Sequence, residues 1–196
     1  MVATTLTVVA GIADAVGYMT MGGVFAANMT GNTVLAGIAV AQWNGLEAWH
    51  HLVPLLAFFG GAMLARLLLR LTQSPRPALV IEAATLAAVG FLPVGEQVAL
   101  LAVAAAMGAQ ASAITRLARS TVSTVVVTST LARGAEALLD FLWPAGQQSL
   151  PAIVNRRLLA LTWIGYLAGA VAGALLIKVM AWPLLVPAAL LVLLLI

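Results

Sequence analysis

The stretch from residue 22 to residue 33 reads Gly-Gly-Val-Phe-Ala-Ala-Asn-Met-Thr-Gly-Asn-Thr, and apolar runs lie on both sides of it. Its glycines and polar side chains indicate extended backbone over Gly22–Met29. The apolar segment that follows, Thr30–Trp43, is shorter than the roughly 20 residues that a membrane-spanning helix needs. The stretch therefore predicts an extended segment that leads into a half-length helix.

The composition of the whole chain is that of a membrane protein. Of the 196 residues, 63% are apolar and 8% are charged, whereas soluble domains carry about 25% charged residues. So few charges cannot cover such an apolar interior in water, and the same numbers exclude intrinsic disorder. The 9 Lys and Arg residues form no cluster, which argues against a nucleic-acid partner. The expected partner is the lipid bilayer.

Six further segments approach spanning length and predict an all-α polytopic fold. They are Thr4–Met21, Leu52–Leu71, Ala78–Pro93, Val98–Thr115, Leu158–Met180 and the shorter Trp182–Ile196. A second unusual stretch is Ser120–Phe141. Its β-branched first half is typical of extended structure, and its second half is typical of a helix.

Short motifs recur along the chain and indicate an internal duplication. Gly11-Ile-Ala-Asp-Ala is echoed 97 residues later by Gly108-Ala-Gln-Ala-Ser, and Met29-Thr-Gly-Asn-Thr is echoed 98 residues later by Val127-Thr-Ser-Thr-Leu. After a longer loop, Phe59-Gly-Gly-Ala-Met-Leu-Ala is echoed by Leu167-Ala-Gly-Ala-Val-Ala-Gly. We interpret the chain as two membrane repeats, residues 1–95 and 96–196, within a single integrated membrane domain.

Two topologies fit this duplication. If the two unusual stretches are re-entrant, each repeat has three spanning helices and one extended segment with its half-helix, and the second repeat is inverted. Seven basic residues then lie on the cytoplasmic side and only Lys178 lies outside, as the positive-inside rule favours. If all eight segments cross the membrane, the repeats are parallel. We prefer the inverted arrangement, which is a recurrent plan of transporters, and the eight-span arrangement stays open.

Two signatures resemble those of the YoaK-like family of bacterial integral membrane proteins, a domain-of-unknown-function family. The first is Gly11-Ile-Ala-Asp-Ala-Val-Gly-Tyr18 with Gly23-Val-Phe-Ala-Ala-Asn-Met-Thr-Gly-Asn-Thr33, and the second is Met107-Gly-Ala-Gln110 with Thr128-Ser-Thr-Leu. The second departs from the family at Ala111 and Ser129. The resemblance implies a multi-pass protein of the bacterial cytoplasmic (inner) membrane, and it implies no substrate.

Asp14 is the sharpest candidate for a functional residue. It lies about ten residues into the first apolar segment, roughly 15 Å deep, where a charged carboxyl costs several kcal/mol and usually faces a cavity or a partner. One interpretation is a proton or cation site. The other is a carboxyl that caps the nearby half-helix through the amides of residues 30–32, and the two roles are compatible. Gln110 lies at similar depth in the second repeat, either in the site or in an interhelical hydrogen bond.

The starts of the two half-helices supply the remaining candidates for solute binding. In the first repeat these are Thr30, Gly31, Asn32 and Thr33, and in the second they are Thr128 and Thr130. Such residues are typical of a helix N-terminus, whose free amides in a midplane cavity would also face a solute. The helix dipole favours an anion or a neutral polar solute.

Other polar residues have simpler interpretations. Glu82 is expected to pair with Arg76 or Arg70, and Trp43 and Trp49 indicate an interfacial belt. His50 and His51 do not share a helix face, so no metal site is expected there.

These features predict a small-solute transporter, with proton coupling through Asp14 as one option. A non-transporting scaffold or assembly protein is an alternative, because small-residue helices also suit association with other helices or with a second copy of the chain. A channel is a second alternative. The sequence carries no enzyme or phosphate-binding signature, so we expect no enzymatic activity, no cofactor and no metal.

Overall fold

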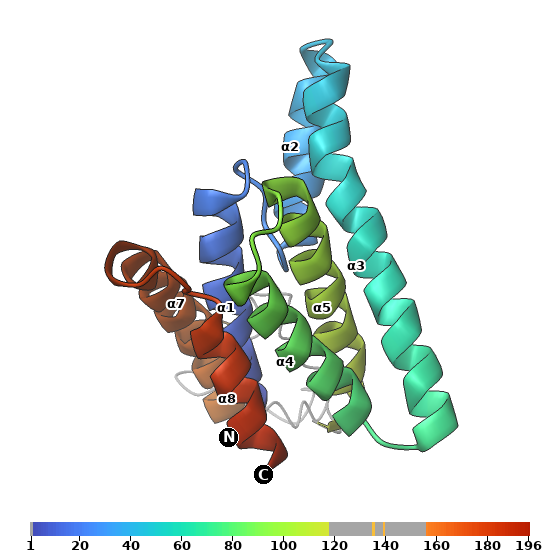
Figure 1. Cartoon of the computed structure of the whole chain (residues 1–196), viewed down its shortest axis with the longest axis vertical. Coiled ribbons are helices and arrows are strands. Elements are labelled where there is room, and N and C mark those ends of the chain that lie inside the picture. The colour runs from blue at the N-terminus through green and yellow to red at the C-terminus, as the bar shows by residue number, and fades with distance from the viewer. Residues whose placement is uncertain (1, 118–134, 136–138, 140–155) are drawn as a thin grey trace.

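In the residues that it describes, the structure is a bundle of helices without strands (Figure 1). It is a computed structural model that describes residues 2–117, 135, 139 and 156–196. The helices described over their length are α1 (Val2–Thr20), α2 (Met29–Ala41), α3 (Gly45–Thr72), α4 (Arg76–Phe91), α5 (Glu96–Leu117), α7 (Arg156–Val179) and α8 (Leu185–Leu195).

All six apolar segments predicted from the sequence form helices, so the all-helical fold is confirmed for the described residues. Three of these helical stretches are long and apolar enough to cross a bilayer: Val2–Thr20, Gly45–Thr72 and Ala160–Val179. The half-length helix predicted after the glycine-rich stretch is α2. The second unusual stretch, Ser120–Phe141, lies outside the described residues apart from two isolated positions, and so do Thr128 and Thr130.

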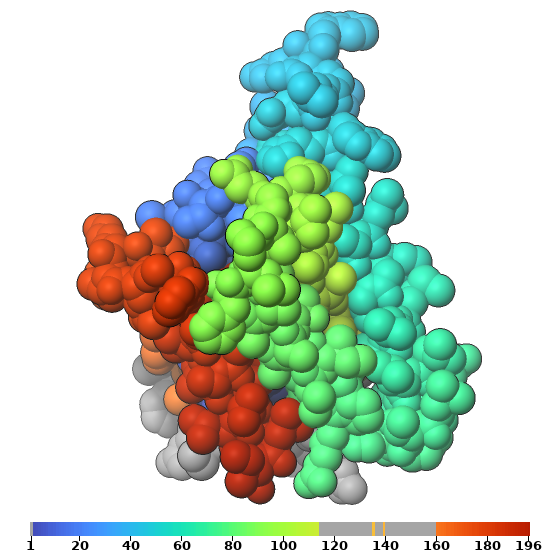
Figure 2. Space-filling model, in the orientation of Figure 1, coloured from blue at the N-terminus to red at the C-terminus, as the bar shows by residue number. Residues whose placement is uncertain are grey.

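Apart from α2, which runs in the same direction as α1, the helices alternate in direction along the bundle (Figure 1). Helices α1, α4 and α7 run away from the end that carries both chain termini, whereas α3, α5 and α8 run back toward it. Helices α1 and α5 therefore run in opposite directions. At the end away from the termini, α2 and the start of α3 project beyond the other helices (Figure 2), and the Trp43 side chain between them is 96% exposed.

Two asparagines start the helices of this projecting hairpin. Asn28 precedes α2, and its side-chain oxygen accepts a hydrogen bond from the Gly31 amide at 3.1 Å. Asn44 precedes α3 and accepts from the Glu47 amide at 3.1 Å. Both bonds satisfy amides that the first turn of a helix leaves without an intrahelical partner. The caps therefore fix where α2 and α3 begin.

Glycines bring α1 and α7 into direct backbone contact. A Cβ atom at Gly11 would collide with the carbonyl oxygen of Tyr166, and a Cβ atom at Gly169 would collide with the carbonyl oxygen of Val8. Helices in membranes approach this closely only where small residues line the crossing. The crossing therefore places Tyr166 of α7 beside the middle of α1.

Helices α3 and α5 cross in the same way. Here Gly108 meets the carbonyl oxygen of Phe58, and Gly61 meets that of Ala105. The glycines of this crossing correspond to those of α1 and α7 at the offsets of the recurring motifs, with Gly108 following Gly11 by 97 positions and Gly169 following Gly61 by 108. The residues that they meet are related by the same two offsets. The two crossings thus match position by position.

Candidate functional site

Asp14 lies in the middle of α1, with 2% of its surface exposed. Its Oδ1 atom accepts hydrogen bonds from the backbone amides of Ala27 at 2.6 Å and Asn28 at 3.1 Å. The chain therefore turns back after α1 and returns as extended backbone to the level of Asp14 before α2 begins. Along the way, the backbone of Val24 passes over Gly17, where a Cβ atom would lie 3.1 Å from the Val24 oxygen.

Tyr166 of α7 completes the surroundings of the Asp14 carboxyl. Its hydroxyl donates a hydrogen bond to Asp14 Oδ2. Both carboxyl oxygens are therefore occupied, and all three contacts come from donors. Hydrogen bonds to a carboxylate are the stronger kind in proteins, so this group ties α7 and the extended segment to α1.

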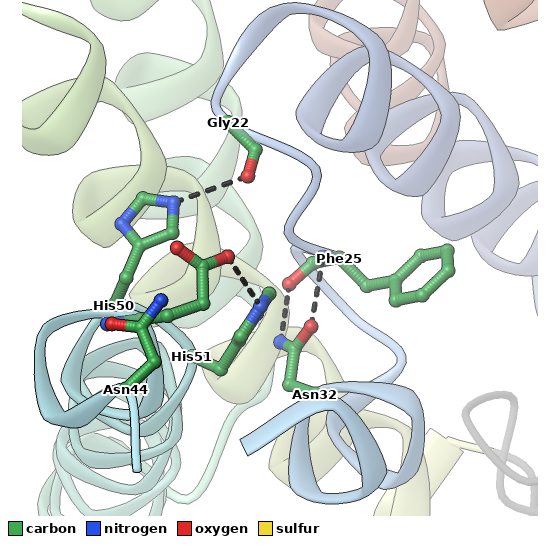
Figure 3. Close-up of polar contacts among 7 residues, drawn as sticks. Gly22, Phe25, Asn32, Asn44, His50 and His51 are labelled. Atoms are coloured by element: carbon green, nitrogen blue, oxygen red, sulfur yellow. Dashed lines mark hydrogen bonds and ion pairs between the residues drawn. The ribbon is translucent and has the colours of Figure 1, made fainter. Parts of the chain in front are cut away.

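Asn32 holds the same segment from the side of α2 (Figure 3). Its Oδ1 accepts from the Phe25 amide at 2.9 Å, and its Nδ2 donates to the Phe25 carbonyl oxygen at 2.8 Å. Asn32 is fully buried. Its two bonds satisfy the backbone amide and carbonyl of Phe25, which in extended backbone would otherwise pair with a neighbouring strand. The Asp14 cluster, as we call it, consists of Asp14, Tyr166, Asn32 and the backbone of Phe25, Ala27 and Asn28.

The structure corrects the expected cap of the half-helix. Asp14 binds the amides of residues 27 and 28, one turn before the predicted 30–32, and the capping side chain is Asn28. The reason is that α2 starts at residue 29, so the amides of residues 27 and 28 precede the helix. A Cβ atom at Gly31 would lie 2.9 Å from the Phe25 ring, so a larger residue there would force the ring to shift.

Within the described residues, the other polar side chains predicted for the site do not belong to the Asp14 cluster. Thr30 and Thr33 are exposed on the first turns of α2, and the Thr33 hydroxyl donates to the Met29 carbonyl oxygen at 2.8 Å. Gln110 is buried on α5, where its Nε2 donates to the Leu6 carbonyl oxygen at 3.0 Å. Leu6 precedes Asp14 by eight positions on α1, which is about 12 Å along the helix. Gln110 therefore makes the interhelical bond that was the simpler interpretation.

The two adjacent histidines stabilise the projecting hairpin. His50 Nε2 lies 3.1 Å from the carbonyl oxygen of Gly22, a residue with φ of +76° (Figure 3). His51 points to another side of α3 and pairs with Glu47 at 3.2 Å. Within the described residues, no three His, Cys, Asp or Glu side chains are grouped so that they would hold a metal ion.

A cavity of about 400 Å³ opens at the far end of α1, where α4 ends and α5 begins. Its lining includes Val16, Thr20, Gly90, Glu96 and Trp182. None of the candidate solute-binding residues in the described part of the chain lines this cavity. Val16 lies two positions after Asp14, so the cavity reaches toward the Asp14 cluster along α1.

Sequence reasoning missed Tyr166 and the structural role of Phe25. A single aromatic residue in an apolar helix is indistinguishable from a lipid-facing or core residue when its partner is 152 positions away. One signal was available, since Tyr166 directly follows the first glycine of the Gly165, Gly169 and Gly173 series. Such spacing indicates a close helix contact, and a buried Tyr hydroxyl requires a polar partner.

Comparison with known proteins agrees with the sequence signatures. Residues 2–196 match the family model described as "Protein of unknown function (DUF1275)". The chain belongs to this family. This DUF1275 protein is similar to the UPF0700 transmembrane protein YoaK of Bacillus subtilis (strain 168), at 32% identity over 183 residues, which cover 87% of this chain and 80% of that protein. No solved structure matches.

These matches confirm the predicted resemblance to YoaK-like proteins. Together with the apolar helices of the DUF1275 chain, they support a location in a membrane. The descriptions of the family and of YoaK name no transported solute and no reaction. The function must therefore be argued from the geometry.

Proposed function

We propose that this DUF1275 protein transports a small solute across the bacterial cytoplasmic membrane as a multi-pass protein. The observation that carries the proposal is the buried extended backbone beside the middle of α1, where Val24, Ala26 and Ala27 are at most 1% exposed. In a bilayer, non-helical backbone is tolerated only where protein buries it or where it lines a water-filled cavity. Many secondary transporters build their substrate sites from such interrupted helices.

A re-entrant α2 is the second part of the proposal. Its 13 residues extend about 20 Å, less than the roughly 30 Å of the hydrocarbon core. Helix α2 starts beside Asp14, which lies in the middle of α1. The chain then enters α3, whose His50 contacts Gly22 in the loop after α1. The start of α3 therefore lies near the end of α1. This arrangement favours six spanning helices over eight.

Two inverted repeats, residues 1–95 and 96–196, are the third part. The opposite directions of α1 and α5 support them, as do the two glycine crossings, whose residues correspond at offsets of 97 and 108. In transporters with this plan the solute site lies near the midplane, where the repeats meet. On this proposal Thr128 and Thr130 start the second half-helix.

The geometry divides the roles of the candidate residues. Both Asp14 oxygens and both polar atoms of the Asn32 amide are occupied, so we assign these residues to positioning α2. Thr30 is exposed at the first turn, so we assign it to contact with the solute. The positive end of the α2 dipole favours an anion or a polar group, whereas the Asp14 carboxyl behind it disfavours negative charge. A neutral polar solute fits both influences best.

The Asp14 cluster favours transport over a scaffold, and the kinetics of flux separate a transporter from a channel. A scaffold would account for the glycine crossings, but it gives no role to a carboxyl and extended backbone buried in mid-bundle. A channel would use the same pathway without saturation of the flux. The proposal includes neither a catalysed reaction nor a cofactor.

Cysteine accessibility tests the pathway without knowledge of the solute. The chain contains no cysteine, so each introduced thiol is the only one. In proteoliposomes, Thr30→Cys should react with a water-soluble, membrane-impermeant methanethiosulfonate, whereas Ala36→Cys, at a residue 4% exposed on the same helix, should not. An unreactive Thr30→Cys in folded protein would contradict a water-filled pathway at α2.

Flux measurements test the activity itself. Stopped-flow light scattering on proteoliposomes should show saturable uptake of at least one neutral polar probe, such as urea, glycerol or a short amide, with formate and acetate as anionic probes. The isosteric Thr30→Val should weaken the apparent affinity about fivefold, the scale of one lost hydrogen bond. Thr72→Val at the end of α3 should leave it unchanged. Flux that never saturates would indicate a channel, and flux equal to that of empty liposomes would contradict transport.

A further inference from the structure

Glu82 is a buried carboxyl that the Asp14 cluster does not use. It lies on α4 with 0% of its surface exposed, and neither Oε1 nor Oε2 has a hydrogen-bond partner among the described residues. The pairing expected from the sequence is therefore wrong. Arg76 and Arg70 are both exposed, and Arg76 precedes Glu82 by six positions, which places it on another side of the helix.

The buried side chains beside Glu82 on α4 are apolar. The neighbours on its own buried face of α4 are Ala78, Leu79, Ala83 and Leu86. Helix α4 packs against α3, α5 and α8. Among these, α8 has no ionisable side chain, α5 has Glu96 in its first turn and Arg116 in its last, and α3 has Glu47, His50, His51, Arg66 and Arg70. The ion pair in the described part of the chain is His51 with Glu47, so none of the described ionisable groups on α3 pairs with Glu82, and neither does Glu96.

The physical cost of this burial depends on the protonation state of the carboxyl. An ionised carboxylate without a partner in an apolar interior costs several kcal/mol, whereas the neutral acid costs far less. A bound metal cation would require several oxygen ligands, and the flanking side chains on α4 supply none. A proton is the one ligand that needs no further donor group.

We propose that Glu82 is a proton-binding site in the membrane core of this protein and that it carries the coupling proton of transport. The coupling role rests on the proposed function. In the binding step, an O–H bond forms between a Glu82 oxygen and a proton from water, and the reverse step returns that proton, with no change of oxidation state. The role first suggested for Asp14 thereby passes to Glu82, because three donors already hold the Asp14 carboxyl.

The route to water leads toward the cavity at the end of α4. Val89 and Gly90 line that cavity, seven and eight positions after Glu82, which is about 10–12 Å along the helix. Leu86 lies one turn beyond Glu82 on the same face and is fully buried. Proton exchange therefore requires a movement that opens the bundle at Leu86.

Infrared spectroscopy tests proton binding without any substrate. At neutral pH, full-length protein in lipid should show a carboxylic C=O band that is absent from Glu82→Gln and retained in Asp14→Asn. The band should shift in D₂O, because the proton exchanges with water. A wild-type spectrum without this band, or a band that never shifts in D₂O, would overturn the proposal.

Carbodiimide labelling gives a second readout on the unmodified chain. Dicyclohexylcarbodiimide adds to protonated carboxyls in apolar surroundings, and peptide mass spectrometry locates the adduct. We expect an adduct on Glu82 and none on Asp14, with a yield that falls about tenfold per pH unit above the midpoint of titration. A yield on Glu82 that is independent of pH, or labelling at Asp14 in preference, would overturn the assignment. Because it uses the unmodified chain, this labelling tests proton binding at Glu82 even if the Glu82→Gln variant does not fold.

The coupling role is tested separately. If a transported probe is found, Glu82→Gln should remove the pH dependence of its uptake while uptake itself persists. An unchanged pH dependence would overturn the coupling role and leave the transporter proposal standing. Conversely, a protein that transports nothing but passes the infrared test would retain the proton site and lose the transporter proposal.

Discussion

Tyr166 donates its hydroxyl hydrogen to Asp14 across 152 positions of the chain. The offsets that relate the two glycine crossings carry Asp14 to Ala111 and Tyr166 back to Phe58. The second pair therefore lacks both the carboxyl and the hydroxyl. Since an isolated carboxyl or hydroxyl would be costly in the bundle, the apolar Ala111 and Phe58 side chains leave no such group unpaired at these two positions.

The Tyr166 hydroxyl should contribute measurably to stability. Tyr166→Phe removes one hydrogen bond to a carboxyl, so we expect the free energy of unfolding to fall by about 1.5–3 kcal/mol. Chemical unfolding in mixed micelles measures it. Tyr18→Phe is the matched control, because that ring is 47% exposed and stacks on Phe25 at 4.8 Å without needing its hydroxyl. In the Asp14→Asn variant, Tyr166→Phe should lower the free energy of unfolding by less than it does in the unmodified chain. An equal decrease would show that the two residues are not coupled.

Asn32→Asp should be more harmful than its nearly identical shape suggests. The carboxylate retains an acceptor for the Phe25 amide but loses the donor, so a negative oxygen faces the Phe25 carbonyl oxygen in a buried place. We expect a loss of folded protein on size-exclusion chromatography and a lower unfolding temperature. Thr33→Ala, one position along at an exposed side chain, should change stability by no more than about 0.5 kcal/mol. Equal behaviour of the two variants would contradict the role of Asn32.

Adjacent glycines on α3 provide an internal comparison of the helix crossing. Gly61→Ala should destabilise by about 1–3 kcal/mol or more, because its Cβ would overlap the Ala105 carbonyl oxygen on α5. Gly60→Ala should be neutral or slightly stabilising, since a Cβ there meets nothing within 4 Å and Ala favours a helix. Unfolding temperatures of the two variants in one detergent check the difference. A similar effect at both sites would mean that α3 and α5 are not in backbone contact.

The re-entrant path of α2 can be tested with single cysteines at two exposed positions and at one partly buried position. Thr20→Cys lies at the end of α1, Gln42→Cys follows α2, and Ser74→Cys lies between α3 and α4. In intact cells, an impermeant thiol reagent should label the first two from the same side of the membrane, and Ser74→Cys should be labelled only after permeabilisation. Labelling of Thr20→Cys and Gln42→Cys from opposite sides would establish α2 as a spanning helix.

The sequence predicted the described helices well, because a long apolar run has few alternatives to a helix in a membrane. It also identified Asp14, since a carboxyl in an apolar helix demands a partner. It could not supply that partner, because the Tyr166 hydroxyl and the amides of residues 27 and 28 come together only when α7 and the extended segment pack on α1. The predicted ion pair of Glu82 was wrong for a related reason. Proximity in sequence suggested Arg76, but α4 points the two side chains to different sides.

The glycine crossings have a consequence for how the chain is assembled. Each one joins a helix from before residue 95 to a helix from after it, α1 with α7 and α3 with α5. A nascent chain that ends after α4 can form the α2–α3 hairpin but neither glycine crossing. The crossings should therefore form only after the later helices are made, and two polypeptides divided between α4 and α5 should regain the bundle only when both are synthesised in the same membrane.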